Sequence, residues 1–255
     1  LRLGVLEFLD VAKADGRIRF AGFSFHDEPS AFQPIVDGYD WDFCQIQYNY
    51  MDVDYQAGRE GLRYAARRGL GVVVMEPVKG GRLAGRVPDE VQSIWGSAAV
   101  RRSPAEWALR FVWDDPDVSL LLSGMSTMEQ VVENVRIAGE ADAKSLNETE
   151  SALIDKVRRV YEQRTVVPCT ACRYCMPCPE GIDIPMVLAF LNDASLYDNA
   201  AGEKVHYHIN KELGGTASVS VCTKCGQCVD ACPQQIQVPD FMEECTRLFE
   251  ADGAV

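Results

Sequence analysis

The 255-residue sequence contains no apolar run long enough to cross a membrane and no apolar leader segment. Basic residues are also few: 25 Lys and Arg stand against 38 Asp and Glu, for a formal net charge of −13. This deficit argues against nucleic acid and against an anionic membrane surface as partners. The hydrophobic fraction of 47% is that of a globular protein. The length allows one large domain or two ordinary ones.

The most informative residues present are cysteines. Eight of the ten lie in two runs, Cys-x2-Cys-x2-Cys-x2-Cys-Pro and Cys-x2-Cys-x2-Cys-x3-Cys-Pro. Three thiolates at such short intervals can wrap a turn around one [4Fe–4S] cubane, while the fourth, followed by Pro, can reach another cluster. The pattern therefore predicts two [4Fe–4S] clusters with crossed ligation, the first held by Cys169, Cys172, Cys175 and Cys232 and the second by Cys222, Cys225, Cys228 and Cys178.

Other uses of cysteine fit the pattern less well. Structural zinc sites usually separate two Cys pairs by a dozen or more residues, whereas here three cysteines follow at minimal intervals. A secreted disulfide scaffold would be a short chain with a signal peptide. We therefore expect reduced, cluster-bearing cysteines in the cytoplasm. The first run has only two residues before its fourth cysteine, which shortens the tether of Cys178. Cys44 and Cys245 are expected to be small core residues.

The two cysteine runs form an internal repeat. Each continues with Pro, an apolar alternation, a second Pro and a helical stretch, at residues 186–192 and 240–249. Duplication of this kind builds a two-cluster, ferredoxin-like unit in which apolar residues exclude water from both cubanes. The insert at residues 194–217 is expected to add a helix and a loop. Its His206 and His208 are expected to be surface or packing residues, because both clusters already have four thiolates.

The first two thirds of the chain alternate apolar runs with amphipathic segments. Runs typical of buried parallel strands cover residues 19–25, 42–48, 71–75 and 118–123, and segments of helical period cover residues 57–68, 105–113 and 128–137. This alternation predicts βα units of a parallel sheet. Further helices are expected at residues 3–14 and 147–162. Ser103, Pro104 and Asn147 are typical of helix N-termini.

Four motifs resemble parts of the aldo/keto reductase barrel. Gly22-Phe23-Ser24 is similar to its strand-five motif, residues 45–49 to its strand-six motif, Met75-Glu76-Pro77 to its strand-seven end and residues 123–135 to its strand-eight phosphate loop and helix. With the cysteine domain, the chain resembles the ferredoxin-tailed branch of that family. The resemblance implies an α/β fold made of the C-terminal half of a TIM-type (β/α)8 barrel (residues 1–145), a connecting helix (146–165) and a mostly α-helical, ferredoxin-like 2[4Fe–4S] domain (166–255).

The resemblance also implies a nicotinamide dinucleotide, NAD or NADP. Ser24 and Gln45 would hold the nicotinamide carboxamide, although a satisfied polar group at a strand end is an equal alternative for both. Family members that use nicotinamide usually have Asn where this chain has Phe25, and an aromatic ring near Met75. Lys79 could touch a pyrophosphate or be solvated.

The segment similar to the strand-eight phosphate loop has chemistry that suits an anion. Gly124, Ser126 and Thr127 open a helix, where backbone N–H groups and the positive end of the helix dipole would face the anion. Gln130 and Asn134 lie one helical turn apart on one face, where their amides could bind an adenine edge.

No residue corresponds to the catalytic Tyr, Asp, Lys and His of the family, because these come from strands one to four and the sequence begins inside what resembles the helix after strand four. We therefore expect a partial barrel with open edges, which alone would aggregate, dimerise or need the missing half. The catalytic residues are unknown. His26, at a strand's C-terminal end, is the one candidate, although a lone histidine beside Asp27 is more often an ordinary surface residue.

Two functions remain open. One is an iron–sulfur oxidoreductase of aldo/keto reductase type, in which nicotinamide-linked redox of a small substrate is coupled to electron relay through two [4Fe–4S] clusters. A flavin could mediate, because a hydride carries two electrons and each cubane passes one. The other is a non-catalytic electron-transfer or structural iron–sulfur module on a diverged barrel. Expected partners are a small-molecule substrate and a redox protein, which an acidic surface could steer. The substrate is not indicated.

Overall fold

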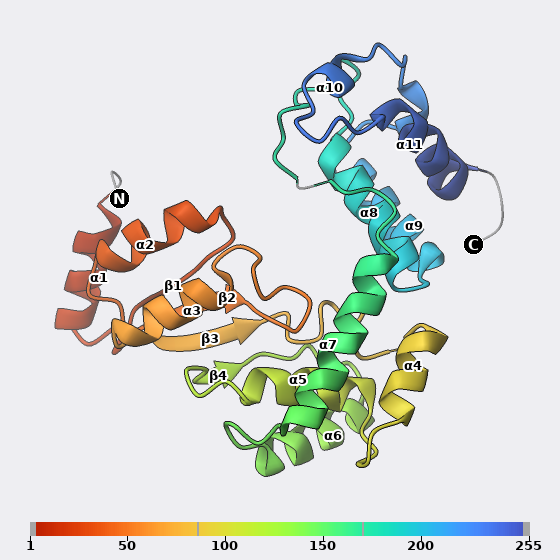
Figure 1. The fold of residues 1–255 in the computed structure, drawn as a ribbon. Helices are drawn as coiled ribbons and strands as arrows, with labels where there is room; N and C mark the ends of the chain where they lie inside the picture. Colours follow the sequence, from red (N-terminus) through yellow and green to blue (C-terminus); the bar gives the residue numbers. More distant parts are fainter. Residues whose placement is uncertain (1–3, 86, 170, 252–255) are drawn as a thin grey trace. The chain divides into compact units, whose positions relative to one another are not determined.

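The computed structural model describes residues 4–85, 87–169 and 171–251 (Figure 1). The chain divides into two compact units, unit 1 (Leu1–Arg158) and unit 2 (Arg159–Val255), and the division falls within helix α7 (Glu148–Gln163). Each unit has its own cluster of buried apolar side chains. None of the described helices is long and apolar enough to cross a membrane.

Unit 1 is built on a four-stranded parallel sheet. Its strands are β1 (Gly22–Ser24), β2 (Phe43–Gln47), β3 (Gly71–Met75) and β4 (Leu120–Leu121), in the spatial order β1-β2-β3-β4. The connections contain the helices α2 (Pro29–Asp37), α3 (Gly58–Arg67), α4 (Asp89–Gly96) and α5 (Pro104–Trp113). This confirms the predicted α/β fold with a partial barrel.

Alternation along the central strands separates the two faces of the sheet. Cys44 and Ile46 on β2, like Val72 and Val74 on β3, are fully buried against α2 and α3, which Figure 1 shows on one side of the sheet. The residues between them, Gln45 among them, are only partly buried on the opposite face. A period of two therefore places the polar strand residues on the face that lines the interior of a complete barrel.

Two parts of unit 1 differ from the prediction. Residues 118–123 were expected to form a buried strand, but β4 covers only two residues, and Leu120 and Leu122 are 48% and 43% exposed. The reason is that β4 has a neighbour on one side only. Helices α2 and α4 were not predicted. Pro34 lies inside α2, and it breaks the sequence pattern that predicts a helix because proline lacks an N–H donor.

The predicted helix starts are confirmed by their hydrogen bonds. The hydroxyl of Ser103 accepts from the Glu106 N–H (3.0 Å) at the start of α5, with Pro104 in the first helical position. The Asn147 side-chain oxygen accepts from the Glu150 N–H (3.0 Å) at the start of α7. Each bond satisfies one of the N–H groups that a helix start leaves unpaired.

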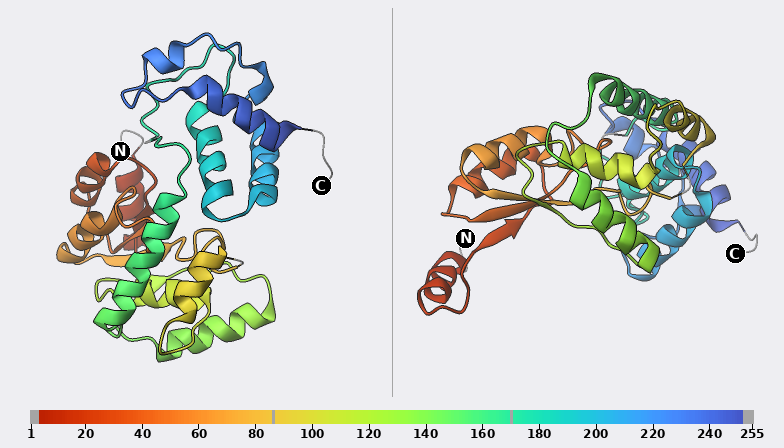
Figure 2. Two further views of the ribbon diagram at one scale, coloured as in Figure 1. Left: turned by 45° about the vertical axis from the view of Figure 1, so that its right-hand side comes forward. Right: turned by 90° about the horizontal axis from the view of Figure 1, so that it is seen from below.

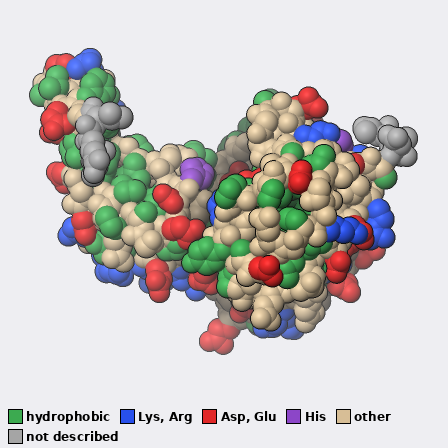
Figure 3. All heavy atoms as spheres, turned by 90° about the horizontal axis from the view of Figure 1, so that it is seen from above, with side chains coloured by type: hydrophobic (Ala, Val, Ile, Leu, Met, Phe, Trp, Pro, Cys, Tyr) green, Lys and Arg blue, Asp and Glu red, His purple; other side chains and the backbone are tan. Residues whose placement is uncertain are grey.

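Apolar side chains are exposed on the helices next to both edges of the sheet. Helix α1 (Val5–Ala14), which precedes β1, exposes Phe8 and Val11 at 57% and 56%. Helix α6 (Met128–Glu140), which follows β4, exposes Met128, Val132 and Val135 at 62–70%. Figure 3 shows hydrophobic side chains on the surface among charged ones of both signs.

We expect the 255-residue chain to self-associate, because strands β1 and β4 leave unpaired backbone groups at the sheet edges and because α1 and α6 expose apolar side chains. Size-exclusion chromatography with light scattering should show dimers or larger species that grow with concentration. A variant that combines Val132→Lys and Val135→Lys should associate less. A wild-type monomer at every concentration would contradict this expectation.

Unit 2 is mostly helical. Its elements are α8 (Ile184–Leu196), α9 (Ala200–Glu212), the 3-10 turn η1 (Val219–Val221), α10 (Gln227–Asp230), α11 (Val238–Cys245) and the π-helical turn η2 (Thr246–Glu250). Helices α8 and α9 lie side by side (Figure 2). Helix α9 is the helix expected in the insert.

The two cysteines outside the runs are core residues, as predicted. Cys44 and Cys245 have no exposed surface, and burial raises the pKa of each thiol to about 12. Both side chains are therefore neutral packing groups at physiological pH.

Candidate metal centre and dinucleotide site

The two cysteine runs share one backbone conformation. Ala171 and Lys224 occupy matched positions with φ of 55° and 56°, and Arg173 and Gly226 occupy the next matched positions with φ of 63° and 80°. Left-handed backbone is unfavourable for non-glycine residues. Its recurrence at the same two positions therefore indicates that both runs are wound in the same way. Thr170, inside the first run, lies outside the described residues.

The repeat continues beyond the fourth cysteine of each run. The N–H of Gly181 donates to the Cys178 carbonyl (2.9 Å), and that of Gln235 donates to the Cys232 carbonyl (3.0 Å). Both residues have positive φ, 75° and 53°. The apolar residues that follow are buried in both copies and lead into helices α8 and α11, at Ile182, Ile184, Ile236 and Val238.

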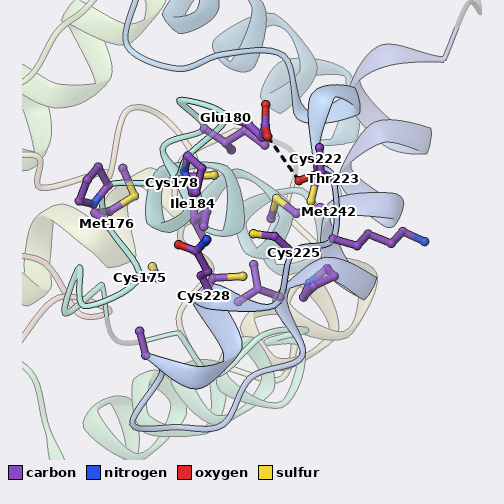
Figure 4. Close-up of a pocket in the computed structure, with 18 of the residues that line it drawn as sticks. Cys175, Met176, Cys178, Glu180, Ile184, Cys222, Thr223, Cys225, Cys228 and Met242 are labelled. Carbon is purple, nitrogen blue, oxygen red and sulfur yellow. Dashed lines mark hydrogen bonds between the residues drawn. The ribbon is translucent and has the colours of Figure 1, made fainter.

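A cavity of about 140 Å³ lies between the two copies, lined by Cys175 and Cys178 from the first run and by Cys222, Cys225 and Cys228 from the second. Figure 4 shows four of these sulfurs around the same space, with Cys175 to one side. A single water needs roughly 10–15 Å³ of such volume, so this cavity has room for a group of several atoms. Four of these five thiols, all except Cys175, are the set that crossed ligation predicts for the second cluster.

Other groups complete the surroundings of this cavity. The apolar side chains of Ile184, Val238 and Met242 line it. The Thr223 hydroxyl donates to a Glu180 carboxylate oxygen (3.3 Å), which joins the second run to the segment after Cys178 (Figure 4). The cavity therefore combines an apolar wall with thiols from both runs, which is the environment that a buried iron–sulfur cluster needs.

The pKa values of two thiols reflect how the cysteines are grouped. Burial raises the pKa of Cys175 to about 11, and nearby charge on Cys169, Cys228 and Cys172 adds to the rise. Burial also raises the pKa of Cys228, with added contributions from Cys222 and Cys225. The third cysteine of each run thus lies near two other cysteines of the same run, and Cys175 also lies near Cys228. Both thiols are protonated at neutral pH and would release a proton when they bind a metal.

The remaining predicted ligands lie at the surface of the unit 2 core. Cys169, Cys175 and Cys232 pack against that core, whereas Cys172 is exposed. Among the described residues, no three His, Cys, Asp or Glu side chains are close enough to hold a single metal ion. A zinc ion would draw its sulfur ligands to about 2.3 Å from one point.

The two histidines of the insert lie in local contacts. A ring nitrogen of His206 lies 3.2 Å from a Glu203 carboxylate oxygen, and His208 Nε2 lies 2.9 Å from the Phe249 carbonyl oxygen. These contacts agree with the packing role predicted for both side chains.

A second cavity, of about 460 Å³, lies at the C-terminal ends of β3 and β4 in unit 1. It is lined by four of the seven predicted dinucleotide-binding residues, Gly124, Ser126, Gln130 and Asn134, and by the loop after β3. Thr127 is the N-cap of α6. The site is thus a helix start facing a cavity, which is the arrangement expected for an anion-binding loop.

The amide side chains of Gln130 and Asn134, on helix α6, take part in local hydrogen bonds. Gln130 Oε1 accepts from the N–H groups of Ser126 (2.8 Å) and Thr127 (3.3 Å), and the Thr127 hydroxyl accepts from the Gln130 N–H (3.4 Å). Asn134 Nδ2 donates to the Ser123 hydroxyl (3.0 Å). To bind an adenine edge, the Gln130 and Asn134 amides would have to give up these local hydrogen bonds. Their adenine-binding role stays a prediction.

Ser24 and Gln45 lie next to each other in register on β1 and β2. Gln45 Nε2 donates to Met75 Sδ (3.4 Å), whereas Ser24 is exposed. Phe25 is buried and meets Phe32 edge to face, with ring centroids 4.9 Å apart. The structure therefore brings Ser24 and Gln45 to one place, but neither is among the described residues that line the cavity at β4.

A polar network that sequence reasoning missed lies at the C-terminal ends of β2 and β3. Asp52 accepts from Gln47 Nε2 (2.7 Å) and Asn49 Nδ2 (2.8 Å), and both of its carboxylate oxygens lie 2.9 Å from Lys79 Nζ. Lys79 is thus paired rather than solvated. The available signal was the turn at Asn49, whose side-chain oxygen accepts from the N–H of Met51 (2.9 Å).

His26 is the second residue after the C-terminal end of β1 and is exposed. The adjacent Asp27 carboxylate accepts from the Glu28 N–H (2.8 Å). Within the described parts of the chain, no hydrogen bond or ion pair joins this imidazole to a carboxylate, so its catalytic role stays a prediction.

Two family models match the chain. The aldo/keto reductase family model matches residues 3–159, and the 4Fe-4S dicluster domain matches residues 168–236. No curated protein matches the chain. These matches support an iron–sulfur protein of oxidoreductase type.

Solved aldo-keto reductases are similar to part of this chain. Both the holo and the apo form of aldo-keto reductase AKR11C1 from Bacillus halodurans are 25% identical over 59% of this chain, cover 54% and 55% of that protein and have a TM-score of 0.49. The thermostable aldo-keto reductase Tm1743, solved with the inhibitor epalrestat, is 19% identical over 59% of this chain and 53% of its own, with a TM-score of 0.47. The chain thus spans about half the length of these proteins. By its family match, the chain belongs to the aldo/keto reductase family.

Proposed function

We propose that the chain acts in an iron–sulfur oxidoreductase, in which unit 2 holds two [4Fe–4S] clusters and unit 1 binds a nicotinamide dinucleotide and a small-molecule substrate. The observation that carries the proposal is the cavity lined by Cys175 and Cys178 of the first run and by three cysteines of the second run. The proposed ligands are Cys169, Cys172, Cys175 and Cys232 for the first cluster and Cys222, Cys225, Cys228 and Cys178 for the second. The clusters supply one-electron transfer when bound.

Residues of unit 2 prepare the thiols for this task. Left-handed backbone at Ala171, Arg173, Lys224 and Gly226 turns the chain between the cysteines at the same two positions of each run. The apolar residues that line the cavity exclude water from it. Both features are needed because exposure to solvent and hydrogen bonds to sulfur set the reduction potential of a cluster.

In unit 1 we propose that the cavity at β4 takes the phosphates and adenosine of the dinucleotide, and that Ser24 and Gln45 hold its carboxamide. Gly124 supports this assignment because nothing lies within 4 Å of the place where its side chain would be, so a ligand can approach the backbone closely. Glu76 and Glu133 also line the cavity, and its described lining contains no Lys or Arg. We therefore expect modest rather than tight affinity for the phosphates.

A second candidate function is a one-electron transfer module on a barrel that no longer binds nicotinamide. Two contacts favour it: Gln45 donates to Met75, and Phe25 is part of the core. We assign no catalytic acid or base, and His26 is the one residue for which we propose a test of catalytic participation, by its replacement with Gln.

Anaerobic titration with NADPH and NADH separates the two functions. Reconstituted protein should contain about eight iron and eight sulfide per chain. In the first function, NADPH or NADH should bleach the cluster absorption. Gly124→Asp should weaken this response about tenfold or more, because it places a carboxylate against the phosphates. Gly139→Asp, near the end of the following helix α6 and equally free of close neighbours, is the matched control and should respond as wild type.

Other outcomes of this titration decide against the first function. Full iron with no bleaching and no dinucleotide binding would support the electron-transfer module. A colourless protein, or one that holds only zinc, would contradict both functions.

A further inference from the structure

The chain that leads into the first cysteine run is held by one side chain of α8. Asn192 Oδ1 accepts from the N–H groups of Val166 (3.0 Å) and Val167 (2.8 Å), and Asn192 Nδ2 donates to the Val167 carbonyl (2.8 Å). The same carbonyl also accepts from the Cys169 N–H (2.8 Å). Val167 is fully buried. The Asn192 amide therefore fixes both the N–H and the carbonyl of Val167, and that carbonyl is the hydrogen-bond acceptor for Cys169, the first cysteine of the run.

The chain that leads into the second run is held in the same manner, but by a different residue. Glu250 of η2 accepts from the Ser218 hydroxyl (2.6 Å) and from the N–H groups of Val219 (2.8 Å) and Ser220 (3.1 Å), and also from the Tyr207 hydroxyl. Val219 is fully buried, and its carbonyl accepts from the Cys222 N–H (3.1 Å).

The two anchors correspond in what they do and differ in where they come from. In each, a side chain binds the backbone of a buried valine whose carbonyl receives the N–H of the first cysteine of a run. One anchor comes from α8, and the other comes from η2. The anchors do not occupy matched positions of the repeat, so each run has acquired its own. Buried N–H groups are costly to leave unpaired, which gives each contact a large effect on its own run.

Charge strengthens the second anchor. Burial raises the pKa of Glu250, but hydrogen bonds from Ser218, Tyr207 and Ser220 outweigh it and lower the pKa to about 2. The carboxylate is therefore ionised at neutral pH, and hydrogen bonds to an ionised acceptor are about twice as strong as neutral ones.

We propose that Asn192 and Glu250 are positioning residues, each for the leading cysteine of one cluster: Asn192 for Cys169 and Glu250 for Cys222. This inference rests on the two clusters of the proposed function. Because the anchors share no bonding partner, weakening one should loosen one cluster and leave the other intact.

The test measures how fast iron is released to a chelator from the reconstituted, full-length protein. Asn192→Asp keeps an oxygen that accepts from the Val166 and Val167 N–H groups, but it replaces the Nδ2 group that donates to the Val167 carbonyl with a second oxygen. Glu250→Gln removes the negative charge and keeps the size of the side chain. Each variant should release about four of its roughly eight iron atoms about tenfold faster than wild type, as expected for weakened buried hydrogen bonds. The double variant should release all its iron at the faster rate.

Matched controls come from the same two elements. Ser195→Ala removes a bond from α8 to the Arg164 carbonyl (3.0 Å), and Thr246→Val removes a bond within α11 and η2 to the Met242 carbonyl (2.9 Å). Both controls should release iron as wild type does. EPR spectra of the reduced single variants should show one altered and one unaltered cluster signal, which a general loss of stability would not produce.

Three results would overturn the inference. The first is an unchanged rate of iron release in both single variants, and the second is equally faster release of all the iron in one single variant. The third is a double variant that still releases half of its iron slowly, because both anchors would then act on the same cluster. A wild-type protein that binds no iron would instead refute the proposed function on which the inference rests.

Discussion

Replacement of Cys178 by Ala is expected to lower the iron content from about eight to about four atoms per chain, together with the same fraction of the sulfide. The physical reason is that Cys178 lines one cavity with Cys222, Cys225 and Cys228. A cluster that loses one of its four thiolates loses both a bond to iron and part of its shield from water. The other cluster keeps all four ligands in the crossed assignment.

Double variants identify which cluster was lost. Cys178→Ala combined with Cys225→Ala should still hold about four iron atoms, because both changes fall on one cluster. Cys178→Ala combined with Cys172→Ala should hold none, because the changes fall on different clusters. Ligation of each cluster by a single run predicts the opposite pair of results. Iron and sulfide analysis of anaerobically purified protein therefore decides between the two assignments.

Local patterns predicted the parts of the structure that depend on neighbours in sequence. The spacing of the cysteines within each run and the alternation along β2 and β3 both repeat over a few residues. The caps at Ser103 and Asn147 likewise join residues three apart. Each of these features can be predicted from a short stretch of sequence, because strand, helix and turn periods are properties of the backbone.

Features that join distant residues were not predictable in the same way. The bonds from Asn192 to Val167 and from Glu250 to Val219 span 25 and 31 residues, and the pair of Asp52 with Lys79 spans 27. Asn, Glu and Lys on a helix or loop are usually solvated, so nothing local distinguishes these three. Only the fold places a buried N–H or carboxylate opposite each of them.

Replacement of Glu106 by Ala is expected to have the largest effect on the stability of unit 1. Glu106 is buried on α5, and its carboxylate accepts from Arg110 Nε (2.8 Å) and Arg136 Nη2 (2.7 Å), which joins α5 to α6. Arg102 Nε lies 3.7 Å from the same carboxylate. The guanidinium side chains of Arg102 and Arg110 are only 11% exposed. Arg102 keeps its bond to Glu150 (2.5 Å), but Arg110 keeps only a contact of 3.4 Å with Glu140. Removal of Glu106 therefore leaves the buried Arg110 charge poorly paired, at a cost of about 3 kcal/mol.

Tryptophan fluorescence can follow this unfolding in unit 1 alone, because all four tryptophans lie there, at positions 41, 95, 107 and 113. Trp95 and Trp107 are stacked with ring centroids 4.8 Å apart, and Trp107 adjoins Glu106 in sequence. Denaturant titrations at one protein concentration should show the loss for Glu106→Ala. The matched control is Glu140→Ala, whose half-exposed carboxylate binds Arg136 (2.6 Å) and should contribute at most about 1 kcal/mol.

The contribution of Glu106 to the unfolding free energy should change with pH in one direction. Burial raises the pKa of Glu106, but hydrogen bonds and charge from Arg110 and Arg136 outweigh it, so the pKa in the folded protein is lowered. A carboxylate with a lowered folded pKa stabilises the fold above its unfolded pKa of about 4.3, and this contribution is lost as the pH falls through the folded value. The difference in unfolding free energy between wild type and Glu106→Ala should therefore be full at pH 7 and shrink below about pH 4. A difference that grows on acidification, or an equal loss in Glu140→Ala, would show that the buried carboxylate does not hold α5 to α6.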